Sequence, residues 1–191
     1  NTVHCEPWEY REAHIVKAFS ARAAVTVGAQ IVMAGLVLKT DSEKLDARNV
    51  QQFAELAQEA HNLGLPLIGE VFPAGNLREW PDEFHNYVVK GCRIACELGA
   101  DAIKTFYTGE RFAEVVEGTP IPVLALGAEK MENEADALQL AQKAVNAGAA
   151  GVVFGRNVVQ ATSPALFLSG LMDVVQGRAS PAVAAVRYLL S

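Results

Sequence analysis

Hydrophobic and polar positions follow two alternating patterns along this chain. In two long stretches, 50–60 and 137–145, apolar residues recur at helical spacing, which predicts amphipathic helices. Short runs that are almost continuously apolar lie between the helical stretches, and such runs are typical of strands in a parallel sheet that helices cover. The strands predicted in this way are 30–38, 66–72, 101–107, 121–126 and 150–155.

A glycine separates each predicted helix from the strand that follows it. Glycine caps a helix C-terminus in the left-handed conformation, and the strand begins directly after that turn. Gly28, Gly64, Gly99, Gly118 and Gly148 occupy this position, and the first three lie about 35 residues apart, the length of one βα unit. We expect a single α/β domain of repeated units, which fits an open doubly wound sheet or a closed (β/α)8 TIM barrel.

The composition is that of a domain with a substantial core. The chain has 191 residues, 51% of them hydrophobic, and no apolar run reaches the roughly 18 residues that span a membrane. Its formal net charge of −6 argues against a nucleic-acid surface, for which a basic patch is expected. No signal peptide is visible at the start. We therefore expect a cytoplasmic protein with neither a membrane nor a nucleic acid as partner.

The cysteines predict neither a disulfide framework nor a metal site. There are three of them, Cys5, Cys92 and Cys96, which is too few for a framework in an ordinary domain of this size. Cys92 and Cys96 share one face of a predicted helix, but no further ligand stands near them in the sequence. We expect no metal and no cofactor.

Lys104 is the residue in the predicted strands that most needs an explanation. Ala102, Ile103 and Phe106 flank it, and apolar surroundings disfavour the charged ammonium. A neutral lysine amine attacks carbonyl groups and forms a Schiff base. The alternative is a lysine at a strand end that reaches solvent or pairs with a carboxylate.

Short loops that contain glycine follow the last two predicted strands. One begins Gly127-Ala128 and the other Gly155-Arg156. Glycine lets a backbone approach a ligand closely, and the amides of such loops can bind an anion, as the loops after the last two strands of (β/α)8 barrels do with phosphate. Arg156 adds a permanently charged, planar group for phosphate oxygens. The alternative is two ordinary turns, with Arg156 in a surface ion pair.

The order of these motifs resembles that of a known family. Lys104-Thr-Phe-Tyr-Thr-Gly, then Gly127-Ala-Glu-Lys, then Gly151-Val-Val-Phe-Gly-Arg-Asn is similar to the archaeal-type class I fructose-bisphosphate aldolases. Their superfamily includes the 2-amino-3,7-dideoxyheptulosonate synthases and the lysine-dependent thiolase of autoinducer-2 breakdown. The resemblance covers about residues 20–190 and is strongest over 98–160.

The resemblance implies a (β/α)8 barrel in which Lys104, on the sixth strand, forms a Schiff base with a small phosphorylated keto substrate. It implies that Gly127, Ala128, Gly155 and Arg156 hold the phosphate. It also implies a homo-oligomer, since members of the family are commonly decamers. The activity would be that of a lyase or an acyltransferase.

Two departures from the family pattern concern the site. Ala128 and Glu129 replace the second glycine and the proline of the family's Gly-Gly-Pro-Lys, which brings a negative charge to the anion site. Phe72 replaces a tyrosine that moves a proton in the aldolases, and a phenyl ring cannot do so. Either Glu70 or Tyr107 takes this role as general acid or base, or the chemistry is closer to that of the thiolase or heptulosonate branches of the superfamily. The alternatives are a structural ion pair for Glu70 and a packed ring for Tyr107.

A third departure concerns length. Matched strand for strand, residue 1 lies near the helix before the family's fourth strand, so the first three strands are absent from this sequence. Five strands cannot close an eight-stranded barrel. We expect residues 1–191 to be the C-terminal five βα units of a longer barrel domain. The competing hypothesis is a non-catalytic barrel relative that binds a phosphometabolite or serves as an assembly subunit.

Overall fold

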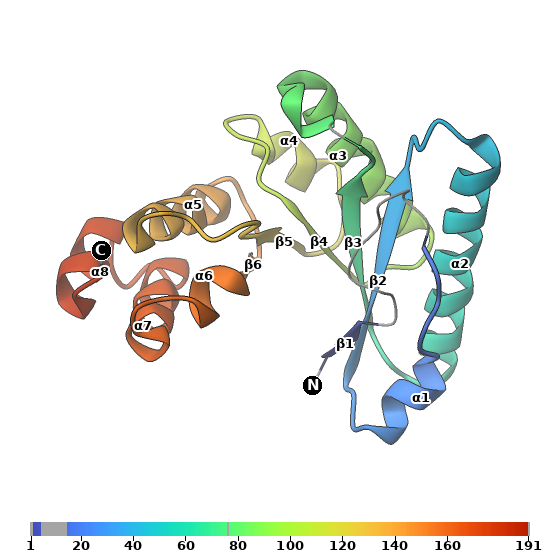
Figure 1. The fold of residues 1–191 in the computed structure, drawn as a ribbon, viewed down its shortest axis with the longest axis horizontal. Coiled ribbons are helices and arrows are strands. Elements are labelled where there is room, and N and C mark those ends of the chain that lie inside the picture. The colour runs from blue at the N-terminus through green and yellow to red at the C-terminus, as the bar shows by residue number, and fades with distance from the viewer. Residues whose placement is uncertain (1, 5–14, 76, 191) are drawn as a thin grey trace. The chain divides into compact units, whose positions relative to one another are not determined.

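The computed structural model describes residues 2–4, 15–75 and 77–190. Contacts between Cα atoms divide the chain into two compact units, Asn1–Pro122 and Val123–Ser191. Each unit alternates parallel strands with helices, as the sequence predicts (Figure 1). Of the helices described, none is both long enough and apolar enough to cross a bilayer.

The first unit is a parallel sheet with helices packed on it. Its strands are β1 (Thr2–His4), β2 (Ile31–Leu38), β3 (Leu67–Pro73) and β4 (Ala102–Phe106), and each pairs in parallel with the next. The helices are α1 (Ala21–Thr26), α2 (Glu43–Asn62), the 3-10 helix η1 (Leu77–Glu79), α3 (Pro81–Glu97) and α4 (Phe112–Glu117). Helix α2 packs on β2, and α3 packs on β3 and β4.

The second unit contains two parallel strands and a helical cluster. The strands β5 (Val123–Leu126) and β6 (Gly151–Val153) pair directly. The helices are α5 (Glu134–Asn146), α6 (Arg156–Val159), α7 (Pro164–Val175) and α8 (Pro181–Tyr188). Buried residues from α5, α7 and α8 form its core, with Phe167 and Leu138 fully buried among them.

The five predicted strands are confirmed within one to two residues at each end, and β1 is additional. Because β1 has three residues, it is too short to show an alternation that a sequence could reveal. Its register with β2, which pairs Thr2 with Ile31, is a property of the folded sheet.

The glycine caps are confirmed at four of the five predicted positions. Gly28, Gly64, Gly99 and Gly148 have φ between 73° and 106°, the left-handed region in which glycine has no steric penalty. Gly118 is the exception, since its φ is −75° and its conformation is helical. There the hydroxyl of Thr119 donates to the carbonyl of Val115 (2.8 Å), which is one of the carbonyl groups at the C-terminal end of α4.

The two faces of β3 have different environments. A Cβ on Gly69 would lie 3.0 Å from Phe53 of α2, and a Cβ on Gly91 of α3 would lie 2.6 Å from Val71. Positions 67, 69 and 71 therefore face the helices. Because strand side chains alternate, Glu70 lies on the opposite face of the sheet.

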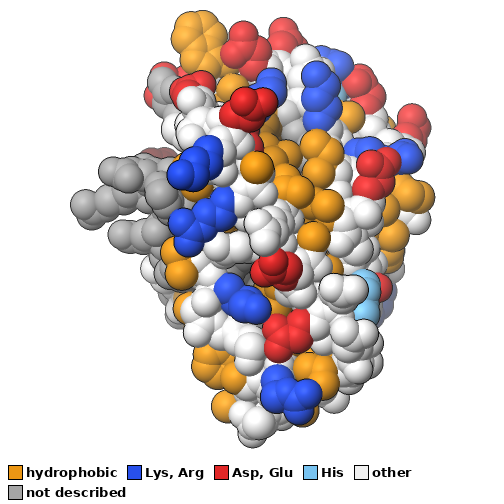
Figure 2. All heavy atoms as spheres, turned by 90° about the vertical axis from the view of Figure 1, so that its right-hand side faces the viewer, with side chains coloured by type: hydrophobic (Ala, Val, Ile, Leu, Met, Phe, Trp, Pro, Cys, Tyr) orange, Lys and Arg blue, Asp and Glu red, His pale blue; other side chains and the backbone are white. Residues whose placement is uncertain are grey.

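The outer surface of α2 is charged. Figure 2, which looks at the right-hand side of Figure 1, shows acidic and basic side chains interspersed over this face. Inward, α2 buries Phe53, Leu56, Ala57 and Ala60 against the sheet. This division between its two faces is what the helical spacing of apolar residues predicts.

Asn49 connects α2 to two other backbone segments. It is fully buried, its Oδ1 accepts a hydrogen bond from the Ile15 N–H (3.3 Å), and its Nδ2 donates to the Val37 carbonyl (2.9 Å). A buried backbone group without a hydrogen-bond partner destabilises the folded protein by its full desolvation penalty. The Asn49 amide avoids this penalty at two backbone groups and so holds the end of β2 in place.

We expect Asn49→Ala to lower the free energy of unfolding by about 1–3 kcal/mol for each backbone group that loses its partner. Urea unfolding measures it. Gln51→Ala is the matched control, because Gln51 lies exposed on the same helix and its side-chain amide donates to the nearby Glu55 (2.8 Å). An equal loss in both variants would mean that the helix itself, and not the buried amide, is the source of the stability.

Candidate active site

Lys104 and Glu70 form an ion pair in the sheet of the first unit. They are register partners on the neighbouring strands β4 and β3, and the Lys104 Nζ contacts the Glu70 Oε1. The two residues are only 9% and 2% exposed. The structure thus brings together two of the three predicted catalytic residues.

The face that carries this pair is the one opposite the helices. Gly35 of β2 is the register partner of Glu70 on its other side. Three adjacent strands therefore carry, side by side on this face, a residue without a side chain (Gly35), a glutamate (Glu70) and a lysine (Lys104). Ala102 and Ile68, register partners on β4 and β3, are half-buried on the same face.

The ion pair changes the expected chemistry of Lys104. The sequence predicts apolar neighbours, and the structure adds a carboxylate. A buried ammonium is costly unless it is paired, and Glu70 supplies the pairing. The same carboxylate can accept the proton that the ammonium must lose before the amine attacks a carbonyl.

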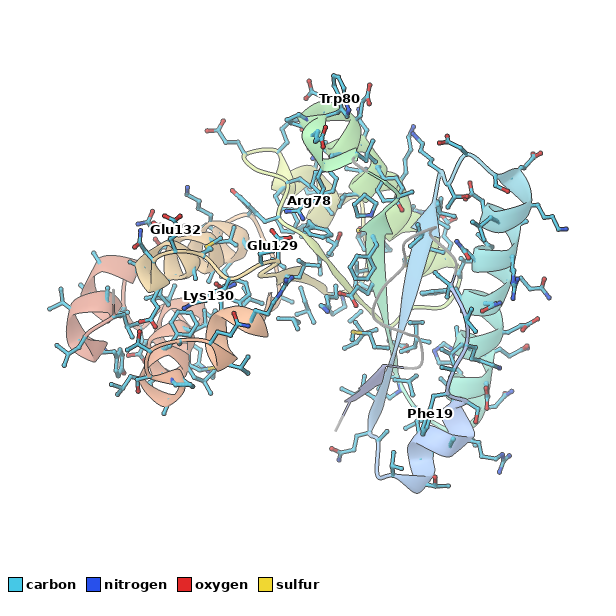
Figure 3. The ribbon with its side chains drawn as sticks, viewed as in Figure 1. Phe19, Arg78, Trp80, Glu129, Lys130 and Glu132 are labelled. Atoms are coloured by element: carbon cyan, nitrogen blue, oxygen red, sulfur yellow. The ribbon has the colours of Figure 1, made fainter. Side chains whose placement is uncertain are left out.

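An aromatic cluster lies beyond Lys104 at the ends of these strands. The rings of Phe72 and Phe106 meet edge to face with centroids 6.2 Å apart, and Phe84 meets Phe106 in the same way at 5.6 Å. The guanidinium of Arg78 lies over the Phe106 ring, 4.8 Å from its centroid (Figure 3). Arg78 has no sequence signal beyond that of a cation shortly after a strand end, so the sequence did not predict it as a site residue.

Tyr107, the third predicted catalytic residue, packs against α4. Its ring lies 5.2 Å from that of Phe112, which is fully buried. Burial, and then the charge of Glu110, raise the pKa of the Tyr107 hydroxyl. These contacts fit the alternative of a packed aromatic ring, and they place Tyr107 against a helix.

His85 holds the loop that follows the lysine strand, a role that the sequence analysis missed. It is 2% exposed on α3, with its Nδ1 2.9 Å from the Thr108 hydroxyl and its Nε2 3.2 Å from Glu114. A carboxylate only accepts, so Nε2 donates to Glu114, while Nδ1 bonds to the Thr108 hydroxyl. Hydrogen bonds from Arg111, and then from His85, lower the pKa of Glu114 to about 2.

Tyr87 fixes the ends of β2 and β3 beside the site. Its hydroxyl accepts from the Leu38 N–H (3.0 Å) and donates to the Phe72 carbonyl. Burial raises the pKa of this hydroxyl to about 12, so it stays a neutral donor at physiological pH. The position of Phe72 is therefore set by a buried hydrogen bond from α3.

The second unit holds the other predicted site residues. Its parallel strands β5 and β6 end side by side, with Leu126 opposite Val153, and the predicted loops follow these ends. The structure therefore brings Gly127 and Ala128 next to Gly155 and Arg156. Arg156 is exposed, and among the described residues no carboxylate pairs with it.

The backbone of these loops offers hydrogen-bond donors. In the part of the chain that the structure describes, no group accepts from the N–H of Ala128, Gly155 or Arg156. Ala128 has φ of 48°, a left-handed conformation that costs a residue with a Cβ about 1–2 kcal/mol. This explains physically why the resembling family has glycine here. Glu129 and Lys130, in the same loop, are exposed (Figure 3).

Of the three cysteines, the structure describes Cys92 and Cys96, and both are free thiols. Cys92 is buried in α3, and burial raises the pKa of its thiol to about 12, which keeps it protonated. Cys5 lies outside the described residues. Within those residues, no group of three or more His, Cys, Asp or Glu side chains could hold a metal ion.

Comparison with known proteins places this geometry in context. The pattern of the DeoC/LacD family aldolases matches residues 4–161. An uncharacterised aldolase of Saccharolobus solfataricus is 30% identical over 174 residues, 89% of this chain and 63% of that protein. A 2-amino-4,5-dihydroxy-6-oxo-7-(phosphonooxy)heptanoate synthase of Streptomyces griseus is 29% identical over 158 residues, 82% of this chain and 56% of that enzyme.

Solved structures agree. A Schiff base-forming fructose-1,6-bisphosphate aldolase superimposes with a TM-score of 0.75 at 31% identity, over 89% of this chain and 65% of that one. An archaeal fructose-1,6-bisphosphate aldolase, with its catalytic lysine covalently bound to a carbinolamine intermediate, gives 0.74 at 29% identity over the same 89% and 65%. The chain thus spans less than two thirds of these relatives.

The comparisons also decide between the two architectures that the sequence allowed. The structural neighbours are (β/α)8-barrel aldolases, so the parallel α/β units of this chain have the fold of part of such a barrel. Taken with the family match over most of its length, this shows that the chain belongs to the DeoC/LacD family of aldolases.

Proposed function

We propose that this protein is a class I aldolase-type enzyme that forms a Schiff base between Lys104 and a small phosphorylated keto compound. The observation that carries the proposal is the buried pair of Lys104 and Glu70 on neighbouring strands. The relative in which a catalytic lysine holds a carbinolamine intermediate supports it. The heptanoate synthase and the fructose-bisphosphate aldolases, whose names carry a phosphate, support the substrate class.

The proposed reaction begins with a proton transfer. Glu70 takes the proton from the Lys104 ammonium, and the neutral Nζ then attacks the carbonyl carbon of the substrate to form a carbinolamine. Loss of water, with a proton returned by Glu70 to the departing hydroxyl, leaves a protonated Schiff base. This cation withdraws electrons from the adjacent carbon–carbon bond. Cleavage then requires a base for the substrate's hydroxyl proton, and Glu70 is again the candidate.

The phosphate is proposed to bind at the loops after β5 and β6. The N–H groups of Ala128, Gly155 and Arg156 and the guanidinium of Arg156 are the donors. Bonds from charged or backbone N–H donors to an anion are short and strong. Glu129, exposed in the same loop, opposes anion binding, so we expect weaker phosphate binding than a Gly-Gly-Pro-Lys loop would provide.

Two reaction types agree with this proposal, aldol cleavage by a lyase and acyl transfer by an acyltransferase. Phe72 cannot move a proton, so the fructose-bisphosphate route that relies on a tyrosine at this position is not the one proposed. The homo-oligomer stays a prediction of the family resemblance, and the cytoplasmic location stays a prediction of the sequence.

We expect sodium borohydride to trap a keto substrate covalently on Lys104. Borohydride reduces a Schiff base to a stable secondary amine, and a modified Lys104 resists trypsin. The adduct is therefore read as a mass shift on the peptide from Ile94 to Arg111. Lys104→Ala abolishes both the adduct and turnover, because no other amine replaces the nucleophile.

Lys39 and Lys130 serve as internal controls, because both are exposed and should stay unlabelled. Dihydroxyacetone phosphate and dihydroxyacetone are suitable probes. If dihydroxyacetone phosphate binds but leaves no adduct on Lys104, the protein is a phosphometabolite-binding relative of the aldolases instead of an enzyme.

We expect Glu70→Gln to slow Schiff-base formation by about 10²–10⁴-fold, the usual contribution of a general acid or base. Glutamine keeps the size of the side chain and removes the proton acceptor. Rapid-quench trapping on Lys104, expressed per folded protein from circular dichroism, measures the rate. Glu70→Asp, which retains a carboxylate, should recover part of it.

Tyr107→Phe tests the other candidate for proton transfer. Because the Tyr107 ring packs on Phe112, removal of its hydroxyl should leave the rate nearly unchanged. A larger loss in Tyr107→Phe than in Glu70→Gln would transfer the role from Glu70 to Tyr107.

We expect Arg156→Ala to weaken binding of the phosphorylated ketone by about 1.5–3 kcal/mol, the scale of a charged hydrogen bond. Isothermal titration with dihydroxyacetone phosphate measures this, while trapping of dihydroxyacetone should be unaffected. Lys143→Ala is the control, since it removes an exposed cation from α5 in the same unit. Equal affinity for the phosphorylated ketone in Arg156→Ala and the unaltered protein would rule out Arg156 as a phosphate ligand.

A further inference from the structure

Asn157 has no role in the function proposed above, yet its buried side chain makes three hydrogen bonds to the loop after β5. It follows Arg156 at the start of α6 and is 3% exposed. Its Oδ1 accepts from the Met131 N–H (2.8 Å), and its Nδ2 donates to the carbonyls of Gly127 (2.9 Å) and Glu129 (3.1 Å). One side chain after β6 thus binds three backbone groups of the loop after β5.

These bonds use three of the four hydrogen bonds that an asparagine amide can make. The carbonyl oxygen accepts one bond, and the NH₂ group donates two. An aspartate could accept from Met131 but would direct a negative oxygen at two carbonyls. Alanine would make none of the three bonds. The environment of Asn157 is therefore specific for an amide of this length.

The three bonds also set the direction of the loop's N–H groups. Each peptide unit is planar and trans, so its C=O and N–H point in opposite directions. The Gly127 carbonyl shares a peptide unit with the Ala128 N–H, and the Glu129 carbonyl shares one with the Lys130 N–H. Because Asn157 draws both carbonyls toward itself, it turns these two N–H groups away from itself.

The loop depends on this arrangement sterically as well. A Cβ on Gly127 would lie 2.7 Å from the Phe154 ring and 3.0 Å from the Asn157 Nδ2, so any side chain there would force Phe154 to shift and would press against the amide. Ala128 keeps its left-handed φ of 48° between the two carbonyls that Asn157 holds. Hydrogen bonds on both sides of this residue can offset its backbone strain.

We propose that Asn157 is a positioning residue for phosphate, which orients the N–H groups of the β5–α5 loop as anion donors and couples that loop to Arg156 in the neighbouring one. The inference rests on the proposed phosphate site and extends it to a residue that does not itself contact the ligand. Asn157 determines preference for a phosphorylated substrate and leaves Schiff-base chemistry alone.

The test compares two ketones that differ only in phosphate. Half-saturating concentrations for borohydride trapping on Lys104 are measured with dihydroxyacetone phosphate and with dihydroxyacetone, and their ratio is the preference for phosphate. The ratio is independent of the folded fraction, so a variant that folds poorly remains informative. Asn157→Asp and Asn157→Ala should each lower this preference at least tenfold, with the limiting rate of dihydroxyacetone trapping unchanged.

Asn146→Asp is the matched control, because it adds the same charge at an exposed position of α5 in the same unit and should leave the preference intact. If both Asn157 variants keep the preference for the phosphorylated ketone and Arg156→Ala loses it, the inference about Asn157 is wrong and the proposed phosphate site is still supported. A loss of dihydroxyacetone trapping equal to that of the phosphorylated ketone would make Asn157 merely structural. If the unaltered protein has no preference for the phosphorylated ketone, the proposed phosphate site is wrong and the inference fails with it.

Discussion

The candidate site depends on one buried ion pair between neighbouring strands. Lys104 and Glu70 are register partners in a parallel sheet, so their separation follows from strand pairing and needs no loop to hold it. Two charges taken from water are tolerated only with good mutual geometry. The strand register that aligns Lys104 with Glu70 therefore provides the partner without which a buried lysine would destabilise the sheet. The same contact lets a proton pass between the two side chains without an intermediary.

The surrounding structure holds the strand ends that frame this pair. Tyr87 bonds the ends of β2 and β3 to α3, and His85 bonds the loop after β4 to the same helix. Each uses a buried polar side chain on α3 to satisfy backbone or loop groups that would otherwise lose hydrogen bonds on burial. The aromatic rings of Phe72 and Phe106 then meet at the ends of β3 and β4, and Phe72 is the residue for which the family resemblance predicts a tyrosine.

In the second unit, the feature that matters is the orientation of the backbone N–H groups in the loop after β5. A peptide N–H that points out of a loop has its peptide carbonyl pointing the other way, and a buried carbonyl needs a partner. In this unit the Asn157 amide is the partner of two such carbonyls. The left-handed Ala128 lies between these carbonyls. Its alanine, where the resembling family has glycine, shows that the geometry of the loop is kept at a cost in backbone strain.

The sequence by itself determined the alternation of helices and strands and four of the five glycine caps, because apolar periodicity and φ > 0 at glycine are local properties. Motif order made Lys104 and the loops after the last two strands candidates for chemistry. It could not show that Glu70 pairs with Lys104, 34 residues away in the chain, since strand register is a property of the assembled sheet. Nor could it show that His85 is buried or that Asn157 satisfies three backbone groups, because both depend on contacts between segments distant in sequence. Gly118 illustrates the same limit, as a threonine hydroxyl there replaced the expected glycine turn. Local patterns therefore specify which elements form and which residues have chemistry, and tertiary packing decides which of those residues meet.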